Sequence, residues 1–166
     1  MNRKYTREEY FAKVKLTRES VPGLGLTTDL IVGFPGETDE DFNDSMSALE
    51  EIRFDLVHSA AYSERDGTPA ATMTGALPVE LRLERLNRLN ELQDSITLGI
   101  NQSLQGHVFE ILVDDVAPKG EGLLQGRTPS DKVVLFEGKK NLIGEFVKVK
   151  ITQAEAWCLH GELISE

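Results

Sequence analysis

The chain has 166 residues, of which 40% are hydrophobic and 28% charged, enough for one hydrophobic core or two small ones. Its 28 acidic and 18 basic residues give a net charge of −10, so any nucleic-acid contact would need a local basic patch. The single cysteine, Cys158, excludes a disulfide framework and a thiolate metal cage within one chain. No apolar signal-like or membrane-spanning segment is visible, which favours a soluble cytoplasmic protein without membrane contact.

The first half of the chain alternates between helical and extended patterns. A capping box at Thr6 predicts a helix that ends before Pro22-Gly23. The run from Leu26 to Phe34 is mostly apolar, as expected for a strand covered on both faces. A second helix is expected over about 39–52 and a second strand over about 55–62. This alternation predicts parallel strands with helices outside them.

A glycine turn, Gly33-Phe34-Pro35-Gly36, joins the first strand to the second helix, which Thr38 caps. Glu37 follows the last glycine where a nucleotide-triphosphate loop has lysine, so we reject that class of site. Asp29 is unusual because it lies in the middle of the strand, where a carboxylate needs a partner or a ligand. It is either half of a structural ion pair or a polar group that faces a cavity, and the residues alone favour the ion pair.

A long helix opens at Pro78 and is expected to end near Gly106. Three arginines repeat along it at every third position. We considered an RNA-facing ridge, but the pattern favours a solvated helix face. The three are Arg82, Arg85 and Arg88.

After Gly106 the pattern changes to short strands separated by glycine and proline turns. Five such strands without an intervening helix predict a small antiparallel β-barrel. The expected strands are 107–113, 122–128, 132–136, 146–152 and 157–164. The fold class is therefore α/β plus all-β, with an α/β domain over 1–106 and a β-barrel domain over 107–166.

Isolated catalytic motifs give no further indication of function. The histidines His58, His107 and His160 are scattered without metal-ligand spacing, so we predict no metal site. Ser63 lacks the pattern of a nucleophile elbow, and no hydrolase triad is evident.

Several long motifs together, however, match one family in order and spacing. They are MNRKYT at the start, TTDLIVGFPGETDEDF (27–42), YSERDGTPAA (62–71) and GRTPSDKVVLFEG (126–138). By these motifs the chain resembles, over essentially its whole length, the radical S-adenosylmethionine (SAM) tRNA methylthiotransferases of the MiaB type. It is similar to their C-terminal part, and this implies the last strands and helices of an incomplete (β/α) radical SAM barrel followed by a TRAM β-barrel.

The resemblance implies an activity that the chain alone does not carry. Enzymes of this family add a methylthio group to an isopentenylated adenosine next to the tRNA anticodon, using SAM and two 4Fe-4S clusters. Both cysteine groups that hold the clusters are missing here, so we expect this chain alone to bind no cluster and to be inactive. Alternatives are a fragment of the related ribosomal-protein methylthiotransferase and a stand-alone RNA-binding module. The expected partners are a tRNA anticodon stem-loop and either the missing N-terminal half or another copy, bound through an exposed sheet edge.

The resemblance also suggests which residues of the first half contact the cofactor. Asp29, Gly36 and Glu37 lie where family members bind SAM across the strand ends. Arg65 has the fork-shaped side chain that suits a carboxylate or phosphate. The family often has proline on both sides of this arginine. This chain has acidic residues there, Glu64 and Asp66, and Asp66 is a candidate partner for Arg65.

In the second half, Arg127, Thr128 and Lys132 fall in the TRAM-like motif and are the expected RNA contacts. The stretch 119–140 has five basic residues, including Lys119, against three acidic ones, including Glu121, and is locally positive. Phe136 either stacks on a base or lies in the barrel core, and both interpretations stay open.

Overall fold

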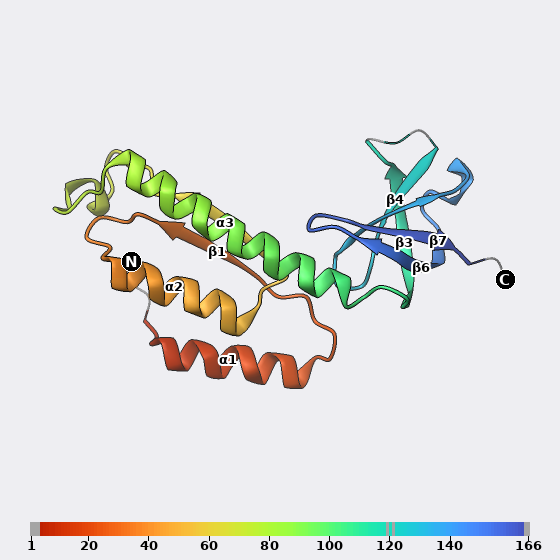
Figure 1. Ribbon diagram of the computed structural model, residues 1–166, viewed down its shortest axis with the longest axis horizontal. Helices are drawn as coiled ribbons and strands as arrows, with labels where there is room; N and C mark the ends of the chain where they lie inside the picture. The colour runs from red at the N-terminus through yellow and green to blue at the C-terminus, as the bar shows by residue number, and fades with distance from the viewer. Residues whose placement is uncertain (1–3, 119, 121, 165–166) are drawn as a thin grey trace. The chain divides into compact units, whose positions relative to one another are not determined.

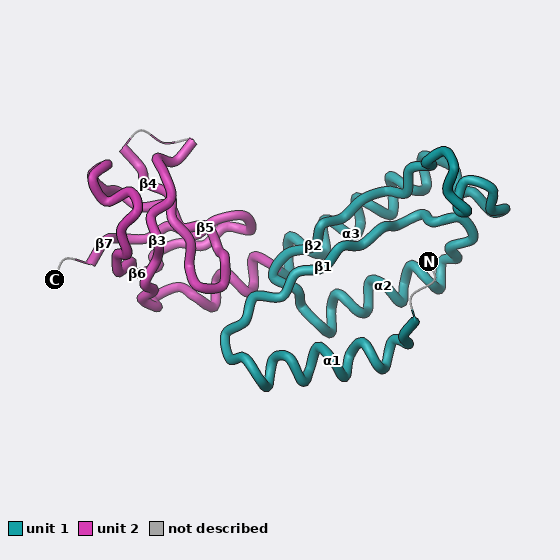
Figure 2. Tube along the Cα trace, turned by 180° about the vertical axis from the view of Figure 1, so that it is seen from behind, with its two compact units in different colours: residues 1–96 teal, residues 97–166 magenta. Residues whose placement is uncertain are grey.

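A computed structural model describes residues 4–118, 120 and 122–164 (Figure 1). Lys119 and Glu121, which contribute to the expected basic stretch, lie outside the described residues. The chain divides into two compact units, residues 1–96 and 97–166 (Figure 2). Within the described part of the chain, no helix is both long enough and apolar enough to cross a membrane.

Helices and strands alternate in the first unit, as predicted. Its elements are α1 (Arg7–Ser20), β1 (Thr27–Val32), α2 (Asp39–Ile52), β2 (Leu56–Ala61), the 3₁₀ turn η1 (Pro69–Thr72) and the start of α3 (Val79–Gln102). The two strands pair in parallel, with Asp29 opposite His58. Both α1 and α2 begin with a complete capping box, at Thr6 and Thr38. Since the strands form a sheet of two, the incomplete radical SAM barrel stays a prediction.

The two faces of this small sheet differ in burial. Val32 and Val57 lie on the face that packs against the helices, where the hydroxyl of Ser59 donates to the Asn90 side chain of α3 at 2.6 Å. The opposite face is exposed at Thr27, Asp29 and Ile31 of β1 and at His58 and Ala60 of β2. The expectation that β1 is covered on both faces was therefore wrong for the described residues, because the helices pack on one face only.

The second unit is a closed five-stranded barrel, and its five strands lie where the sequence predicted them. They are β3 (Val108–Val116), β4 (Leu123–Arg127), β5 (Val133–Glu137), β6 (Phe146–Ala154) and β7 (Leu159–Leu163), in the order β3-β4-β5-β7-β6. The prediction of an antiparallel barrel was wrong, since β5 and β7 pair in parallel. A closed ring with an odd number of strands cannot alternate in direction throughout, so at least one pair must be parallel.

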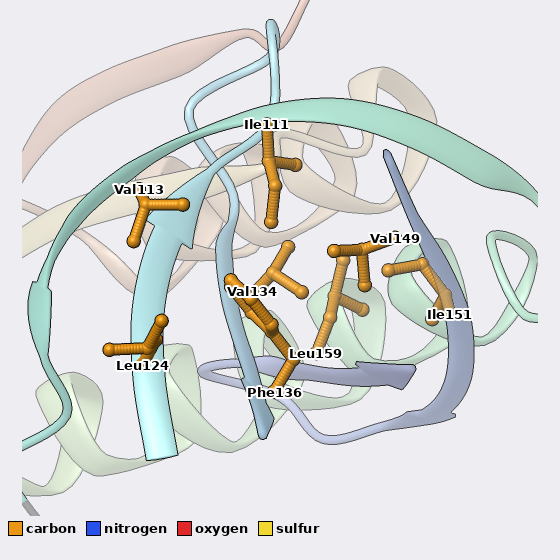
Figure 3. Packing of buried hydrophobic residues seen from close by; sticks show 8 residues of the cluster. All are labelled: Ile111, Val113, Leu124, Val134, Phe136, Val149, Ile151 and Leu159. Atoms are coloured by element: carbon orange, nitrogen blue, oxygen red, sulfur yellow. The ribbon is translucent and has the colours of Figure 1, made fainter. Parts of the chain in front are cut away.

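The core of the barrel follows from the alternation of side chains along its strands. Every second residue points inward, and the eight core side chains are all at most 1% exposed (Figure 3). These are Ile111, Val113, Leu124, Val134, Phe136, Val149, Ile151 and Leu159. Position 126 points toward the same interior but has no room for a side chain, because a Cβ there would lie 2.5 Å from the Leu112 carbonyl oxygen. The residues between them point outward and form the surface available to ligands.

Candidate functional site

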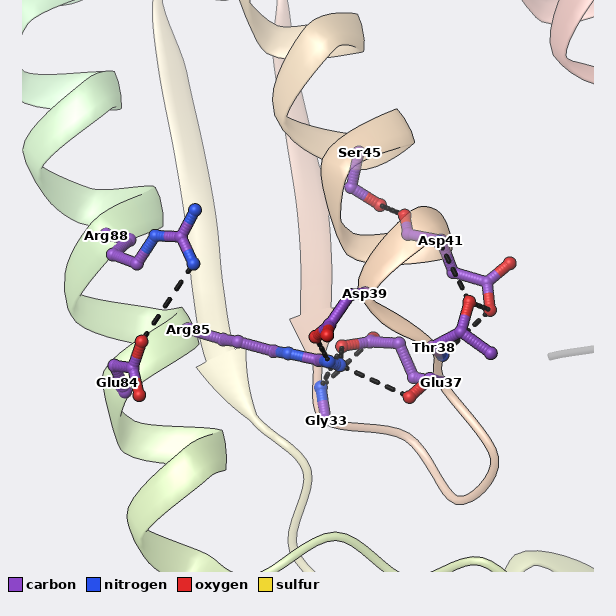
Figure 4. Close-up of polar contacts among 9 residues, drawn as sticks. All are labelled: Gly33, Glu37, Thr38, Asp39, Asp41, Ser45, Glu84, Arg85 and Arg88. Atoms are coloured by element: carbon purple, nitrogen blue, oxygen red, sulfur yellow. Dashed lines mark hydrogen bonds and ion pairs between the residues drawn. The ribbon is translucent and has the colours of Figure 1, made fainter.

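A buried arginine organises the turn that follows β1 (Figure 4). The carboxylate of Glu37 accepts hydrogen bonds from the Gly33 N–H at 2.9 and 3.0 Å, which closes the turn. Arg85 of α3 reaches the same carboxylate with Nη1 at 2.6 Å, and its Nη2 contacts Asp39 Oδ1 at 2.5 Å. Glu37 thus links the backbone of the turn to the long helix.

The charge of Arg85 is maintained by these carboxylates. The residue is only 2% exposed. Burial works against the charged form, but hydrogen bonds to Glu37 and Asp39 and attraction to both outweigh it and raise the pKa of Arg85 above its ordinary value. Arg85 is therefore a permanent cation in the packed interior of the unit.

The solvated-face interpretation of the three arginines was wrong for two of them. Besides the buried Arg85, Arg82 donates from Nη1 to the Tyr62 carbonyl at 2.6 Å, and its side chain leaves no space for a Cβ on Gly33. Only Arg88 is solvated, with a long contact of 3.9 Å to Glu84. Glu37 and Asp39 of the acidic stretch 37–41 pair with Arg85. This stretch is therefore the sequence feature that could have indicated a buried cation on α3.

A pocket of about 340 Å³ opens beside the same turn. Two of the predicted cofactor residues line it, Gly36 and Glu37. Gly36 has a φ of +83°, is exposed, and has open space where a side chain would be. The complete lining is Ile31, Phe34, Pro35, Gly36, Glu37, Asp41 and Met73.

The other two predicted cofactor residues do not line this pocket. Asp29 lies on the exposed face of the sheet, and among the described residues its carboxylate has neither a hydrogen bond nor an ion pair. The favoured ion pair is thus absent from the described part of the chain. Arg65 is exposed in the loop after β2, where its carbonyl accepts from Thr68, and within the described residues it does not pair with Asp66.

On the barrel, the predicted RNA residues have different surroundings. Thr128 is 5% exposed, and its hydroxyl accepts from the Lys132 N–H at 3.1 Å, so it fixes the turn between β4 and β5. Lys132 is half-buried. Phe136 lies in the barrel core at 1% exposure, so its ring offers no face to a base.

Arg127 points outward and is already paired with two carboxylates. Its Nε lies 3.3 Å from Asp114 Oδ2, and its Nη1 lies 2.8 Å from Asp131 Oδ1. The side chain still keeps 43% of its surface exposed. The guanidinium is therefore held in a fixed position with part of its charge compensated.

A row of outward-facing residues crosses the barrel beside Arg127. In the strand register, Phe146 lies opposite Leu112, and Leu112 lies opposite Arg127. Phe146 is 67% exposed, among the most exposed large apolar side chains described. Hydrogen bonds between Val113 and the segment 144–145 hold the loop with the exposed Lys139 and Lys140 against the same strand, β3. Sequence reasoning missed Phe146. Val147 and Val149 face the barrel core, and because side chains alternate along a strand, position 146 is predicted to point outward.

A third group of polar residues gathers at the β6–β7 turn, where Glu155, Cys158 and His160 bring their ligand atoms within 4.8 Å of one another. Burial raises the pKa of the Cys158 thiol, and the charge and hydrogen bond of Glu155 raise it further. The scan for histidine spacing missed this group because its members are three different residue types.

The chain is similar to known proteins over its second unit and over its whole length. The TRAM domain family matches residues 102–164. The tRNA-2-methylthio-N(6)-dimethylallyladenosine synthase of Acetivibrio thermocellus is 46% identical over 164 residues, which cover 99% of this chain and 34% of that protein. The enzymes of the same name from Bacillus cytotoxicus and Moorella thermoacetica are 45% and 46% identical over 100% and 99% of this chain.

The similarity runs along the entire chain, but the chain spans only about a third of the length of these relatives. The barrel of the second unit coincides with the TRAM match. The chain is therefore a homologue of the TRAM-containing part of the tRNA-2-methylthio-N(6)-dimethylallyladenosine synthases.

Proposed function

We propose that this chain is the tRNA-binding part of a methylthiotransferase that modifies isopentenylated adenosine next to the anticodon. The identity of about 46% to enzymes of that name supports the reaction class. The TRAM match supports RNA binding by the second unit, since TRAM domains bind RNA. The expected ligand is the anticodon stem-loop, because the modified base lies there.

The observation that carries the proposal is the exposed row Phe146–Leu112–Arg127 on the barrel. Small barrels bind single-stranded RNA by stacking bases on exposed aromatic rings and by placing cations near the backbone. Phe146 supplies the ring, Arg127 supplies a fixed donor, and Lys139 and Lys140 lie on the adjoining loop. Since Asp114 and Asp131 already compensate Arg127 and the whole chain is acidic, stacking contributes more to affinity here than net charge.

Binding of a labelled anticodon stem-loop RNA to the 166-residue chain tests this assignment. Phe146→Leu keeps an apolar side chain but removes the ring, and it should weaken binding about 5- to 150-fold, which corresponds to the roughly 1–3 kcal/mol of one stacked base. Trp157→Leu is the matched control, because Trp157 is 69% exposed in the turn at the opposite end of β6.

Arg127→Ala should lower the slope of log affinity against log salt by about one unit or less, because a phosphate contact releases about one counterion. Equal losses for Phe146→Leu and Trp157→Leu would contradict a specific stacking site. Unchanged affinity for Phe146→Leu would remove this row from the RNA interface.

We also propose that the exposed sheet face with Asp29 and the pocket with Gly36 and Glu37 face SAM in the complete enzyme. The carboxylate of Asp29, which has no partner among the described residues, and the open space at Gly36 support this. Glu37 shapes the pocket, since Arg85 and Gly33 occupy its carboxylate, and Arg65 is a candidate anion contact. In the complete enzyme, one-electron reduction of SAM by a cluster held outside this chain would supply the radical, and these residues would orient and shield the SAM molecule. Asp29→Asn in a complete enzyme that contains this sequence should raise the KM for SAM, and an unchanged KM would exclude Asp29.

The chain's own donor set does not fit an iron–sulfur cluster. Such clusters are held chiefly by several thiolates, and this chain has one cysteine. The clusters of the complete enzyme must therefore be held by residues outside this chain, and we infer that the chain alone is inactive and acts as an RNA-binding unit.

A further inference from the structure

The turn between β6 and β7 brings together three side chains that commonly bind zinc. Leu159 points into the barrel core, so its neighbours Cys158 and His160 both point outward on the same side of β7. The Glu155 N–H donates to the Cys158 carbonyl at 2.9 Å, and this tight turn places the Glu155 side chain beside the other two.

The spacing of the ligand atoms suits a tetrahedral metal ion. Cys158 Sγ lies 3.8 Å from both His160 Nε2 and Glu155 Oε2, and His160 Nε2 lies 3.2 Å from Glu155 Oε1. Zinc bonds of about 2.3 Å to sulfur and about 2.0–2.2 Å to nitrogen and oxygen place tetrahedral ligand atoms about 3.3–3.6 Å apart. The two Glu155 distances are to different carboxylate oxygens, and with one ligand atom from each residue all three lie within 4.8 Å of one another, so they need to close by about 1 Å to share one ion.

The turn is supported from α3 in the way that metal sites usually require. Asn101, which is 3% exposed, donates from its amide to the Glu155 carbonyl at 2.8 Å and to the Ala156 carbonyl at 3.2 Å. This buried side chain fixes the backbone at Glu155, the first of the three metal-binding candidates. Such outer contacts keep ligands in position and strengthen binding.

We propose that Glu155, Cys158 and His160 form a binding site for one Zn²⁺ ion. One thiolate, one imidazole and one carboxylate form a mixed soft and hard donor set that suits zinc better than calcium or magnesium, which take oxygen ligands. Three protein ligands leave a fourth position for water or a ligand atom. The ion joins the end of β6 to the start of β7 and thereby stabilises the barrel. This site is independent of the proposed RNA row, since Phe146 lies at the other end of β6.

Cobalt(II) provides a spectroscopic test with the untagged 166-residue chain after treatment with a chelator. We expect one equivalent of Co²⁺ to produce a thiolate-to-cobalt charge-transfer band together with the strong visible bands of tetrahedral cobalt. Zn²⁺ should displace the cobalt at a ratio of one to one. Native mass spectrometry should show one zinc per chain.

Variants of the three ligands separate this site from weak surface binding. Cys158→Ser should abolish the charge-transfer band, and His160→Gln and Glu155→Gln should each weaken zinc binding by at least about tenfold. His107→Gln is the matched control, because His107 is exposed on the barrel outside the group. Absence of the band in the folded wild-type chain, or equal zinc affinity in the wild type and Cys158→Ser, would overturn the proposal. In either case Glu155, Cys158 and His160 would be a hydrogen-bonded group only.

Discussion

Arg85 connects α3 to the turn after β1 through two carboxylates of unequal burial. The Glu37 side chain is 12% exposed, whereas the Asp39 side chain is 90% exposed. An ion pair in water contributes little, but a buried charge that loses its partner is costly. The contact between Arg85 and Glu37 is therefore the one that matters for stability.

We predict that Arg85→Met lowers the free energy of unfolding of the first unit by about 3–5 kcal/mol, because it leaves the largely buried carboxylate of Glu37 without its cation. Urea unfolding followed by far-UV circular dichroism measures this, since helices α1 and α2 belong to that unit.

Arg88→Met on the same helix is the control for this measurement. Arg88 has an exposed contact with Glu84 and lies over the Phe42 ring, with its Cζ 4.9 Å from the ring centroid, and the loss of both should cost about 1–2 kcal/mol. Adding Glu37→Gln to Arg85→Met should recover part of the loss, because it removes the uncompensated charge. Similar costs for Arg85→Met and Arg88→Met would show that the buried pair is not important.

At the scale of single elements, local sequence signals predicted more than long-range ones. The capping boxes at Thr6 and Thr38 need only residues three positions apart, and both are present. The strands of the barrel were predictable because turns separate apolar residues that alternate along each strand. The parallel pairing of β5 with β7 was not, because it depends on how five strands close into a ring.

The candidate sites also contain some groupings that are local in sequence and others that only the fold brings together. Gly36 and Glu37 are adjacent in sequence and line one pocket. Arg85 lies 48 residues after Glu37, and only the fold brings them together. Phe136 and Phe146 both lie in strands, but Phe136 points into the barrel and Phe146 points outward. The direction depends on which alternate positions of each strand face the core, and a motif match does not give this. Glu155, Cys158 and His160 are close in sequence, but their grouping depends on the turn that precedes β7.

At the scale of the whole molecule, the two units differ in whether their strands are paired on both sides. The barrel closes on itself, so each of its five strands has a partner on both sides. The first unit has one parallel sheet of only two strands, and among the described residues neither strand has a second neighbour. Parallel sheets normally have more strands and are covered on both faces. The exposed face and edges of β1 and β2 therefore form a surface that favours further pairing.

We predict that the 166-residue chain self-associates through this sheet. Unpaired edges pair with other strands, and the exposed apolar side chain of Ile31, which retains 38% of its surface, adds to the attraction. Sedimentation velocity over a range of protein concentrations should show species larger than a monomer at high concentration. Ile31→Lys should shift the distribution toward monomer, since a lysine on an edge strand opposes pairing.

Ile143→Lys is the control that locates the interface. Ile143 is 39% exposed, almost the same as Ile31, but it lies in the loop before β6 of the barrel. If the sheet is the interface, this substitution leaves the association unchanged. If Ile143→Lys dissolves the oligomer and Ile31→Lys does not, association occurs through the barrel instead. A wild-type chain that stays monomeric at every concentration would show that the open sheet is stable without a partner.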